Sequence, residues 1–432
     1  MTISKDSSPP RFAALRNRDF SLLWTGMLVS TVGSQMQLTA VNWHVFELLR
    51  GSTYTLQLFG GEFALSGEAL GLGTLGLVRV IPIVLFALIG GVLADTLDRR
   101  RLLLVTQAAA TLFAGILAYL SLRGEASVTA IYLLTAAGAA AAAFDNPARQ
   151  ALVPNLVPRE HLTNAVSLNT LVWQIGSVIG PALAGLMVSA IDIGWVYAAN
   201  AISFGAVILA LLLMRYRGRA AANNTGLGWP AVAEGLHFTY SQRIIWGTML
   251  LDFLATFFSS ARTMLPIIAS EVVHVGVQGY GLLSTAQSVG AIVAGAITSY
   301  RGEIKRQGHV LLVSVAIYGV ATLFFGLAAN FYLSYFLFAL TGAADTVSTV
   351  IRGTIRQVLT PDHLRGRMTG VNMIFFMGGP QLGEMEAGLV ASAFGVPFAI
   401  VSGGLATVLL TGWVAWRYPK LRAYEASHGI IT

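Results

Sequence analysis

Charged residues are scarce in this sequence, and cysteine is absent. Only 11% of the 432 residues are Asp, Glu, Lys or Arg, whereas soluble domains carry about 25%. A soluble fold would need more polar surface than this composition supplies. The lack of cysteine excludes disulfide bonds and thiolate metal sites, and we expect no metal site of any kind.

Long apolar runs are abundant instead. A run of roughly 20 apolar residues spans a bilayer core about 30 Å thick. The runs of this length are residues 20–48, 71–94, 102–122, 128–147, 164–190, 194–214, 244–268, 277–299, 309–328, 331–350, 367–392 and 396–416. The sequence therefore predicts an all-α membrane protein with about twelve transmembrane helices.

Polar segments divide these spans into two groups. The clearest boundary is the polar stretch that follows the sixth span. The predicted parts are a cytoplasmic segment 1–19, a six-helix bundle 20–214, a cytoplasmic linker 215–243, a second six-helix bundle 244–416 and a cytoplasmic tail 417–432. The first of these holds no apolar core of its own, so we expect no cleaved signal peptide.

Basic residues are distributed unevenly among the loops. All but four of the 27 Lys and Arg residues fall on the side of the N-terminus, and the exceptions are Arg50, Arg79, Arg123 and Arg262. Because Lys and Arg mark cytoplasmic loops, both termini of a multi-pass membrane protein are predicted to be cytoplasmic, and the resemblance described below implies a bacterial inner membrane. The same distribution explains the net charge of +7 without a nucleic-acid partner.

Motifs for enzymatic or ATP-driven chemistry are also missing. No cluster of His, Asp and Glu, no nucleophile constellation and no ATP-binding motif stands out. Gly71 to Gly76 fits the weak G-x-G-x-x-G form, but this stretch opens an apolar span and is discounted. The sequence therefore predicts neither an enzyme nor a primary pump, and no cofactor.

Part of the sequence repeats at an offset of 203 residues. The matching positions are Arg149, Leu156 and Pro158 in the first half and Arg352, Leu359 and Pro361 in the second. Six spans are an even number, so duplication predicts two pseudo-symmetric bundles in the same orientation. Transporters built from such repeats bind substrate between them.

Two short stretches carry unusual residues. Gly90 to Arg101 crowds two aspartates and three arginines into a turn between apolar runs. In the fifth span, small residues at four-residue spacing favour close helix packing, and a proline frees backbone carbonyls. These helix-packing residues are Gly176, Gly180, Pro181 and Gly185.

With these motifs the chain resembles the major facilitator superfamily over essentially its whole length. The turn from Gly90 to Arg101 is similar to the superfamily's loop between spans two and three, and the fifth-span glycines resemble a motif associated with exporters. Further segments resemble bacterial efflux proteins of the enterobactin-exporter and macrolide-efflux type, namely Ser30 to Gln37, Leu77 to Pro82, Asp145 to Pro158 and Arg365 to Arg367.

The resemblance implies the major facilitator fold and a secondary active exporter that works by alternating access. The expected substrate is a small amphiphilic or hydrophobic molecule of siderophore or drug type. The proton gradient is the expected energy source, and the expected oligomeric state is a monomer surrounded by membrane lipid. The alternative function is an importer or a lysolipid transporter on the same fold. A membrane receptor or an enzyme fits the sequence less well.

The sequence departs from the superfamily at positions linked to proton coupling. Drug/proton antiporters usually carry an arginine in the middle of the fourth span, whereas residues 131–143 hold no charge. Asp98 stands where the loop motif usually has glycine. The second-half counterpart of the loop, residues 300–306, is degenerate.

Charged residues near the span ends predict two gates. At the inner side, the resemblance implies that Asp95 accepts from backbone N–H groups at the start of the eleventh span, where the helix dipole favours an anion. The other predicted inner-gate residues are Arg99, Arg100, Asp145, Arg149, Asp345 and Arg352. At the outer side, Arg79 is expected to pair with Glu384 or Glu386, because an unpaired charge is costly within a membrane. The plainer alternative is that these charges fix topology and solvate helix ends.

Acids within the spans are the predicted proton-coupling residues, namely Asp252, Glu384 and Glu386. Asp252 ranks first because it shares one stripe of the seventh span with Thr256, Ser259 and Thr263. A polar stripe with an acid inside a membrane indicates a cavity lining. A structural hydrogen bond to a neighbouring span is the alternative.

The substrate cavity is predicted to be lined by polar and aromatic side chains. The candidates are Gln35, Gln37, Asn42, Trp173, Gln174, Thr256, Asn372 and Gln381. Residues 51–70 form the longest predicted outer connection. This connection is interpreted either as a lid or as an ordinary loop.

Overall fold

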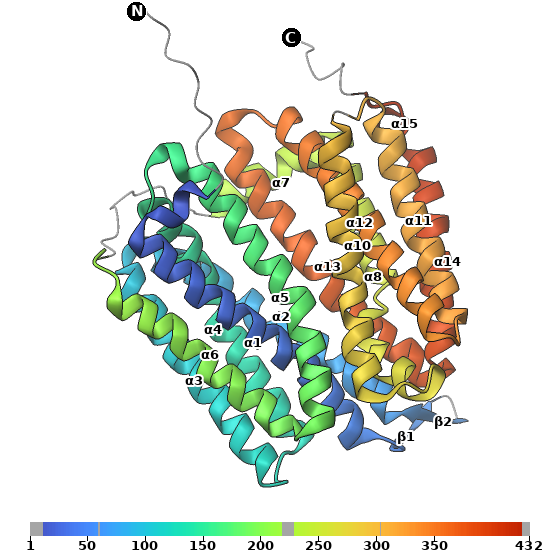
Figure 1. Cartoon of the computed structure of the whole chain (residues 1–432). Helices are drawn as coiled ribbons and strands as arrows, with labels where there is room; N and C mark the ends of the chain where they lie inside the picture. The colour runs from blue at the N-terminus through green and yellow to red at the C-terminus, as the bar shows by residue number, and fades with distance from the viewer. Residues whose placement is uncertain (1–11, 59–60, 218–228, 303, 426–432) are drawn as a thin grey trace, which may run out of the picture. The chain divides into compact units, whose positions relative to one another are not determined.

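The computed structural model describes residues 12–58, 61–217, 229–302 and 304–425 (Figure 1). The first half contains α1 (Arg18–Leu49), β1 (Thr53–Leu58), β2 (Gly61–Ser66), α2 (Gly67–Thr96), α3 (Arg99–Leu122), α4 (Val128–Leu152), α5 (Leu162–Ala190) and α6 (Ile193–Leu213). The second half contains α7 (Trp229–Ser241), α8 (Arg243–Phe258), α9 (Leu265–Ile267), α10 (Gly276–Arg301), α11 (Gln307–Leu327), α12 (Phe331–Leu359), α13 (Arg365–Phe394), α14 (Val396–Arg417) and α15 (Pro419–Arg422). Short turns complete the order, namely η1 (Ala13–Arg16), η2 (Val153–Asn155), η3 (Arg159–His161), η4 (Arg262–Met264), η5 (Ile268–Val272) and η6 (Asp362–Leu364).

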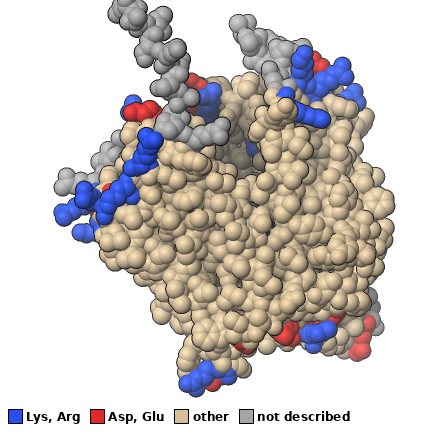
Figure 2. Space-filling model, viewed as in Figure 1, with Lys and Arg blue, Asp and Glu red and all other residues tan. Residues whose placement is uncertain are grey.

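Most of these helices are long and apolar. Among the described residues, 10 stretches have the length and hydropathy needed to cross a membrane. α1 and α13, which are 32 and 30 residues long, occupy the other two predicted spans but lie outside this set. On the face shown in Figure 2, charged side chains gather near the helix ends, and the surface between them is uncharged. The predicted all-α membrane architecture is therefore confirmed.

Contacts between Cα atoms divide the chain into two compact units. Unit 1 contains Met1–Ala40 and Ile81–Asn223, and unit 2 contains Val41–Val80 and Asn224–Thr432. Unit 2 therefore includes the end of α1, both strands and the beginning of α2, which the sequence assigns to the first half. The predicted division into bundles 20–214 and 244–416 stays a prediction.

A β-hairpin occupies much of the stretch interpreted as a lid or a loop. β1 and β2 pair antiparallel, from Thr53 opposite Ser66 to Leu58 opposite Gly61. β2 lies against α13 within unit 2. The connection therefore has regular secondary structure that the sequence analysis missed, and a role as a lid stays a prediction.

Asp98 begins α3, which explains its presence where the loop motif usually has glycine. Its side-chain Oδ1 accepts hydrogen bonds from the backbone N–H groups of Arg100 at 2.9 Å and Arg101 at 3.1 Å. These N–H groups have no partner inside the helix, so an aspartate at this position is an N-cap. A glycine would not supply these two bonds.

A break interrupts the helix of the seventh predicted span. α8 ends at Phe258, and η4, α9 and η5 follow. Pro266 lies in the first turn of α9, where its missing N–H leaves no helix bond unmade. The backbone carbonyl of Ser259 accepts from Tyr318 Oη at 3.3 Å, and the Ser259 hydroxyl lies 2.8 Å from Thr407 Oγ1. These bonds satisfy polar groups at the break inside the apolar unit.

The glycines of the predicted helix-packing motif bring α5 close to α1 in unit 1. A Cβ added at Gly176 would lie 2.7 Å from Thr31 Cγ2, and one at Gly180 would lie 2.5 Å from Gln35 Cβ. Both distances are too short for carbon atoms that are not bonded. The motif therefore acts in packing here, as small residues do between membrane helices.

Glycines also bring α10 and α12 together in unit 2. A Cβ added at Gly290 would overlap the carbonyl group of Ala339, and one at Gly342 would overlap that of Gln287. The two backbones are therefore in direct contact from both sides. Any larger residue at either glycine would push the helices apart.

Replacing Gly290 with valine is expected to lower the stability of the protein by about 1–3 kcal/mol, because an overpacked site forces backbone shifts. Gly295 on the same helix is the matched control, since the nearest atom to a Cβ there is Thr346 Cγ2 at 3.9 Å. Thermal unfolding of the purified protein in detergent measures both variants. Equal melting temperatures for G290V and G295V would contradict the packing described here.

Candidate functional site

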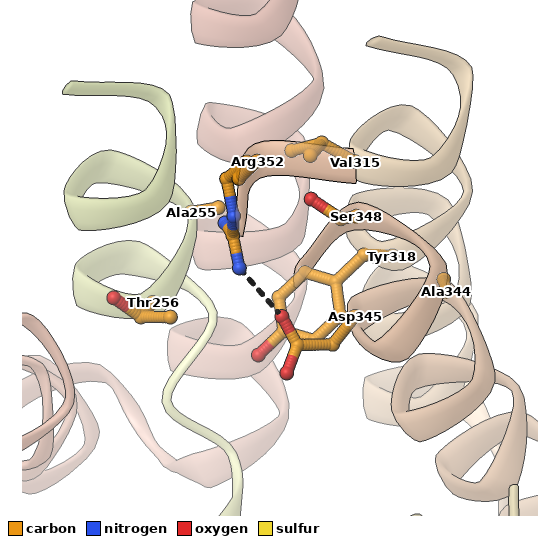
Figure 3. A pocket seen from close by; sticks show the side chains of 8 residues that line it. All are labelled: Ala255, Thr256, Val315, Tyr318, Ala344, Asp345, Ser348 and Arg352. Carbon is orange, nitrogen blue, oxygen red and sulfur yellow. Dashed lines mark hydrogen bonds and ion pairs between the residues drawn. The ribbon is translucent and has the colours of Figure 1, made fainter. Parts of the chain in front are cut away.

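Buried charges of α8 and α12 meet in unit 2. Arg352 Nη1 lies 2.6 Å from Asp252 Oδ1, and Arg352 Nη2 lies 3.3 Å from Asp345 Oδ1. The side chains of Arg352 and Asp252 are 3% and 5% exposed, whereas that of Asp345 is 48% exposed. In Figure 3 the Arg352 side chain points toward Asp345. One arginine therefore holds two acids that differ in their access to solvent.

A second arginine lies one turn further along α12. Arg356 is buried and donates to Asn372 Oδ1 of α13. Its charge interacts with those of Arg352 and Asp252. Two arginines therefore balance two aspartates, and the cluster links α8, α12 and α13.

The space beside this charge cluster is small. Its lining residues are Ala255, Thr256, Val315, Tyr318, Ala344, Asp345, Ser348 and Arg352 (Figure 3). Its volume of about 10 Å³ is enough for about one water molecule. The place suits a water molecule or a proton and is too small for a drug-sized substrate.

The burial of these charges is costly and adds little stability by itself. Removing a charged group from water costs several kcal/mol even after relaxation of the protein. Arg352 Nε has no hydrogen-bond partner among the described residues. Ionisable residues inside membrane spans generally mark sites of transport or proton relay. The predicted coupling acid Asp252 and the predicted gate residue Arg352 thus belong to one functional candidate.

The predicted polar stripe of the seventh span is mostly buried, and its role as a cavity lining stays a prediction. Asp252, Ser259 and Thr263 are all buried within unit 2. Asp252 is covered because Arg352 binds it, and the break after Phe258 takes Ser259 and Thr263 out of the helix. The alternative, a structural bond of Asp252 to a neighbouring span, also stays open, since Arg352 of α12 binds Asp252.

The repeat-related arginine of unit 1, Arg149, is bound locally. It pairs with Asp145 four residues earlier on α4. Asp145 is buried, and its Oδ1 accepts from Thr106 Oγ1 at 2.8 Å and from Gln107 Nε2 at 2.7 Å, both on α3. This pair therefore ties α4 to α3 and contains only one acid. The predicted role of both arginines as inner gates stays a prediction.

Arg79 pairs with one of its two predicted partners. Arg79 Nη1 lies 3.4 Å from Glu384 Oε2, and each side chain is 12% exposed. Arg79 Nη2 also donates to Asn42 Oδ1 at 2.7 Å. Glu386 is half-buried and has no hydrogen bond or ion pair with any other described residue. The pairing of Arg79 with Glu384 is confirmed, and its role as an outer gate stays a prediction.

Glycines of α2 and α13 permit this pair. A Cβ added at Gly73 would lie 2.7 Å from the Cα of Gly388, and one at Gly76 would lie 2.8 Å from Glu384 Cβ. The two helices therefore approach at backbone distance beside the ion pair. Close approach lets the short side chain of a glutamate reach the arginine.

The other predicted inner-gate residues lie at the end of α2 and at the start of α3. Arg99 Nη1 donates to the carbonyl of Ala151 at 3.0 Å, and Arg100 Nη2 donates to that of Leu212 at 3.2 Å. These carbonyls lie in the last turns of α4 and α6, where the helix dipole favours a cation. The side chain of Asp95 lies outside the described residues, so its bond to the eleventh span stays a prediction.

The predicted cavity residues are divided between the units. In unit 1, Gln37 Oε1 accepts from Asn200 at 2.6 Å. In unit 2, Asn42 and Asn372 are bound by arginines, and Thr256 donates to the backbone of its own helix. The remaining candidates are Gln35, Trp173, Gln174 and Gln381. Their side chains make no hydrogen bond with any described residue. The assignment of a substrate cavity to this set stays a prediction.

Some residues of these clusters were missed by the sequence analysis. Arg356 had a signal, because it lies one turn after Arg352 on the same helix face. Thr106 and Gln107 had none, since ordinary polar residues occur in many spans. Their role depends on a contact with α4 that only the fold creates.

Long apolar helices with buried ion pairs between them are typical of multi-pass membrane transporters. A family model described as "Transmembrane secretion effector" matches residues 9–430, and the chain belongs to that family. The superfamily resemblance inferred from the motifs is thereby confirmed. The protein is an inner-membrane transporter of the major facilitator type with a small-molecule substrate, and its family and relatives are transporters rather than enzymes.

Individual relatives support the same class. The chain is 30% identical over 334 residues to the enterobactin exporter EntS of Citrobacter koseri, which covers 75% of this chain and 79% of the relative. It is 25% identical over 369 residues to the staphyloferrin A transporter of Staphylococcus aureus, which covers 84% and 92%. The crystal structure of a D-xylose–proton symporter superimposes on this chain with a TM-score of 0.70 and 13% identity. The match covers 94% of this chain and 99% of the symporter chain, and it shows the fold alone.

Proposed function

We propose that the protein is a proton-driven exporter of siderophore-type molecules that works by alternating access. The observation that carries this proposal is the cluster of Asp252, Arg352 and Asp345 inside the membrane-spanning part of unit 2. A siderophore-type substrate is supported by the similarity to an enterobactin exporter and a staphyloferrin A transporter. The proton gradient as energy source and a monomeric state are parts of the same proposal.

Protonation of the cluster weakens the ion pair that connects α8 with α12. Asp252 lies on α8, whereas Arg352 and Asp345 lie on α12. A proton on Asp252 removes the charge that Arg352 binds at 2.6 Å, so Arg352 keeps Asp345 alone and α8 is released from α12. Asp345, with its side chain 48% exposed, offers the route by which a proton enters from water. Loading and release of a proton therefore alternate with release and closure of the helix pair.

The pair of Arg79 and Glu384 supplies the second element of the proposed cycle. It ties α2 to α13, and Asn42 adds the end of α1 to the same contact. In the orientation predicted from the basic residues, this contact closes the outer side. It breaks when the outer side opens to release the substrate.

Transport into everted membrane vesicles tests the proposed function. We expect vesicles that contain the protein to take up labelled enterobactin or staphyloferrin A when respiration supplies a proton gradient, and an uncoupler to stop the uptake. Vesicles from cells that lack the protein are the control. Uptake that survives the uncoupler would contradict proton coupling, and no uptake of either molecule would contradict the substrate type.

A further inference from the structure

Arg262 is the one residue of η4 that is exposed to solvent. It lies directly after the break that ends α8, and its neighbours Ala261, Thr263 and Met264 are buried. It is also one of the four basic residues that fall outside the predicted cytoplasmic segments. Irregular backbone at membrane depth is tolerated where it is buried in protein or lines a water-filled space.

The guanidinium of Arg262 has no partner of its own. It makes no hydrogen bond or ion pair with any described residue, and its electrostatic interactions are with Glu384, Tyr280 and Arg79. Glu384 already binds Arg79 at 3.4 Å. Two arginines therefore share one carboxylate, which leaves a surplus positive charge in this part of unit 2.

Other unsatisfied polar atoms lie on the same elements. Thr263 Oγ1, next to Arg262, and Gln381 Oε1, one turn before Glu384 on α13, are buried without a hydrogen-bond partner among the described residues. Tyr280, which interacts electrostatically with Arg262, is buried and stacks on Trp43 with ring centroids 5.5 Å apart. A cation and a few convergent polar groups are components of a small-molecule site.

We propose that Arg262, together with the positive charge of Arg79, binds an anionic oxygen group of the transported molecule, of the carboxylate type. A planar guanidinium donates two parallel hydrogen bonds to a carboxylate, and an unpaired guanidinium inside a membrane span requires such a partner or water. The inference rests on the proposed function and assigns its substrate class as a small carboxylate-bearing molecule. The bound carboxylate competes with Glu384, so substrate binding weakens the contact between α2 and α13.

Calorimetric titration of the purified full-length protein in detergent micelles tests this site. The probes are citrate, which carries three carboxylates, and its neutral trimethyl ester. We expect the wild-type protein to bind citrate and not the ester. R262Q is expected to bind citrate about tenfold more weakly or worse, because a charge-assisted bidentate contact is lost, and R262K is expected to lie between the two.

Two further variants separate binding from folding. E384Q removes the competing carboxylate and is expected to bind citrate several times more tightly than the wild type. R123Q is the matched control, because Arg123 lies in unit 1 with its guanidinium over the Tyr119 ring, far along the chain from this site. All variants are compared after size-exclusion chromatography shows one symmetrical peak.

The inference is overturned if R262Q binds citrate as the wild type does, if the ester binds as well as citrate, or if the wild type binds neither probe. None of these results depends on proton transport. If the protein binds citrate through Arg262 but shows no uncoupler-sensitive transport, the site is supported and the proposed export is contradicted. If transport is uncoupler-sensitive but R262Q binds citrate as the wild type does, the site is contradicted and the proposed export is not.

Discussion

Replacing Asp252 with asparagine is expected to abolish proton-driven transport and to leave substrate binding measurable. Asparagine keeps the size of the side chain but cannot form the ion pair that Arg352 makes at 2.6 Å. Removing one partner of a buried pair costs about 3–5 kcal/mol when the other is left alone. The cost is smaller here because Asp345 still lies 3.3 Å from Arg352.

The rate of transport as a function of pH is the measurement for this prediction. D145N is the matched control, because Asp145 is a buried acid paired with an arginine in the other unit. We expect D145N to lower the rate and keep the pH profile of the wild type, whereas D252N has no pH-dependent component. An unchanged pH profile in D252N would remove Asp252 as the coupling acid.

Exchanging the charges of Arg79 and Glu384 is expected to restore transport that each single reversal abolishes. R79E places two carboxylates together, and E384R places its arginine beside Arg79 and near Arg262. Like charges at this distance inside a membrane are unfavourable. The double variant R79E/E384R recovers an ion pair between α2 and α13 with the charges exchanged.

The neighbouring glutamate makes this experiment specific. Glu386 lies two residues further along α13, on another side of the helix, and pairs with no described residue. R79E/E386R is therefore expected to stay inactive. Transport rates in everted vesicles distinguish the two double variants. Normal transport by both single variants, R79E and E384R, would end the assignment of this pair as a gate.

The approximate position of most membrane helices was predictable because lipid dictates their length. An apolar run must match the thickness of the bilayer core, so α6, observed as Ile193–Leu213, lies within a residue of the predicted 194–214. The hairpin of β1 and β2 was not predictable from the same signal, since residues 51–66 lie outside the apolar runs. The break after Phe258 was not predictable either, because residues 244–268 form one apolar run.

The sequence predicted the residues of the candidate site, but it predicted only some of the ion pairs that they form. Asp252 was expected to act as a charge inside a span, and Arg352 as an inner-gate residue at the end of one. They are 100 positions apart, so sequence spacing does not show that Arg352 bridges Asp252 and Asp345. Arg79 was expected to pair with Glu384 or Glu386 because an unpaired charge is costly within a membrane. The choice of Glu384 over Glu386 needed the side-chain geometry.

Proton movement in proteoliposomes tests the central claim most directly. The purified protein is reconstituted with a pH-sensitive dye in the lumen, and enterobactin or staphyloferrin A is added outside without an imposed pH gradient. Proton antiport predicts that the lumen becomes more alkaline as the molecule enters, and that D252N gives no change. Entry of the molecule with a constant or falling lumenal pH would contradict the account.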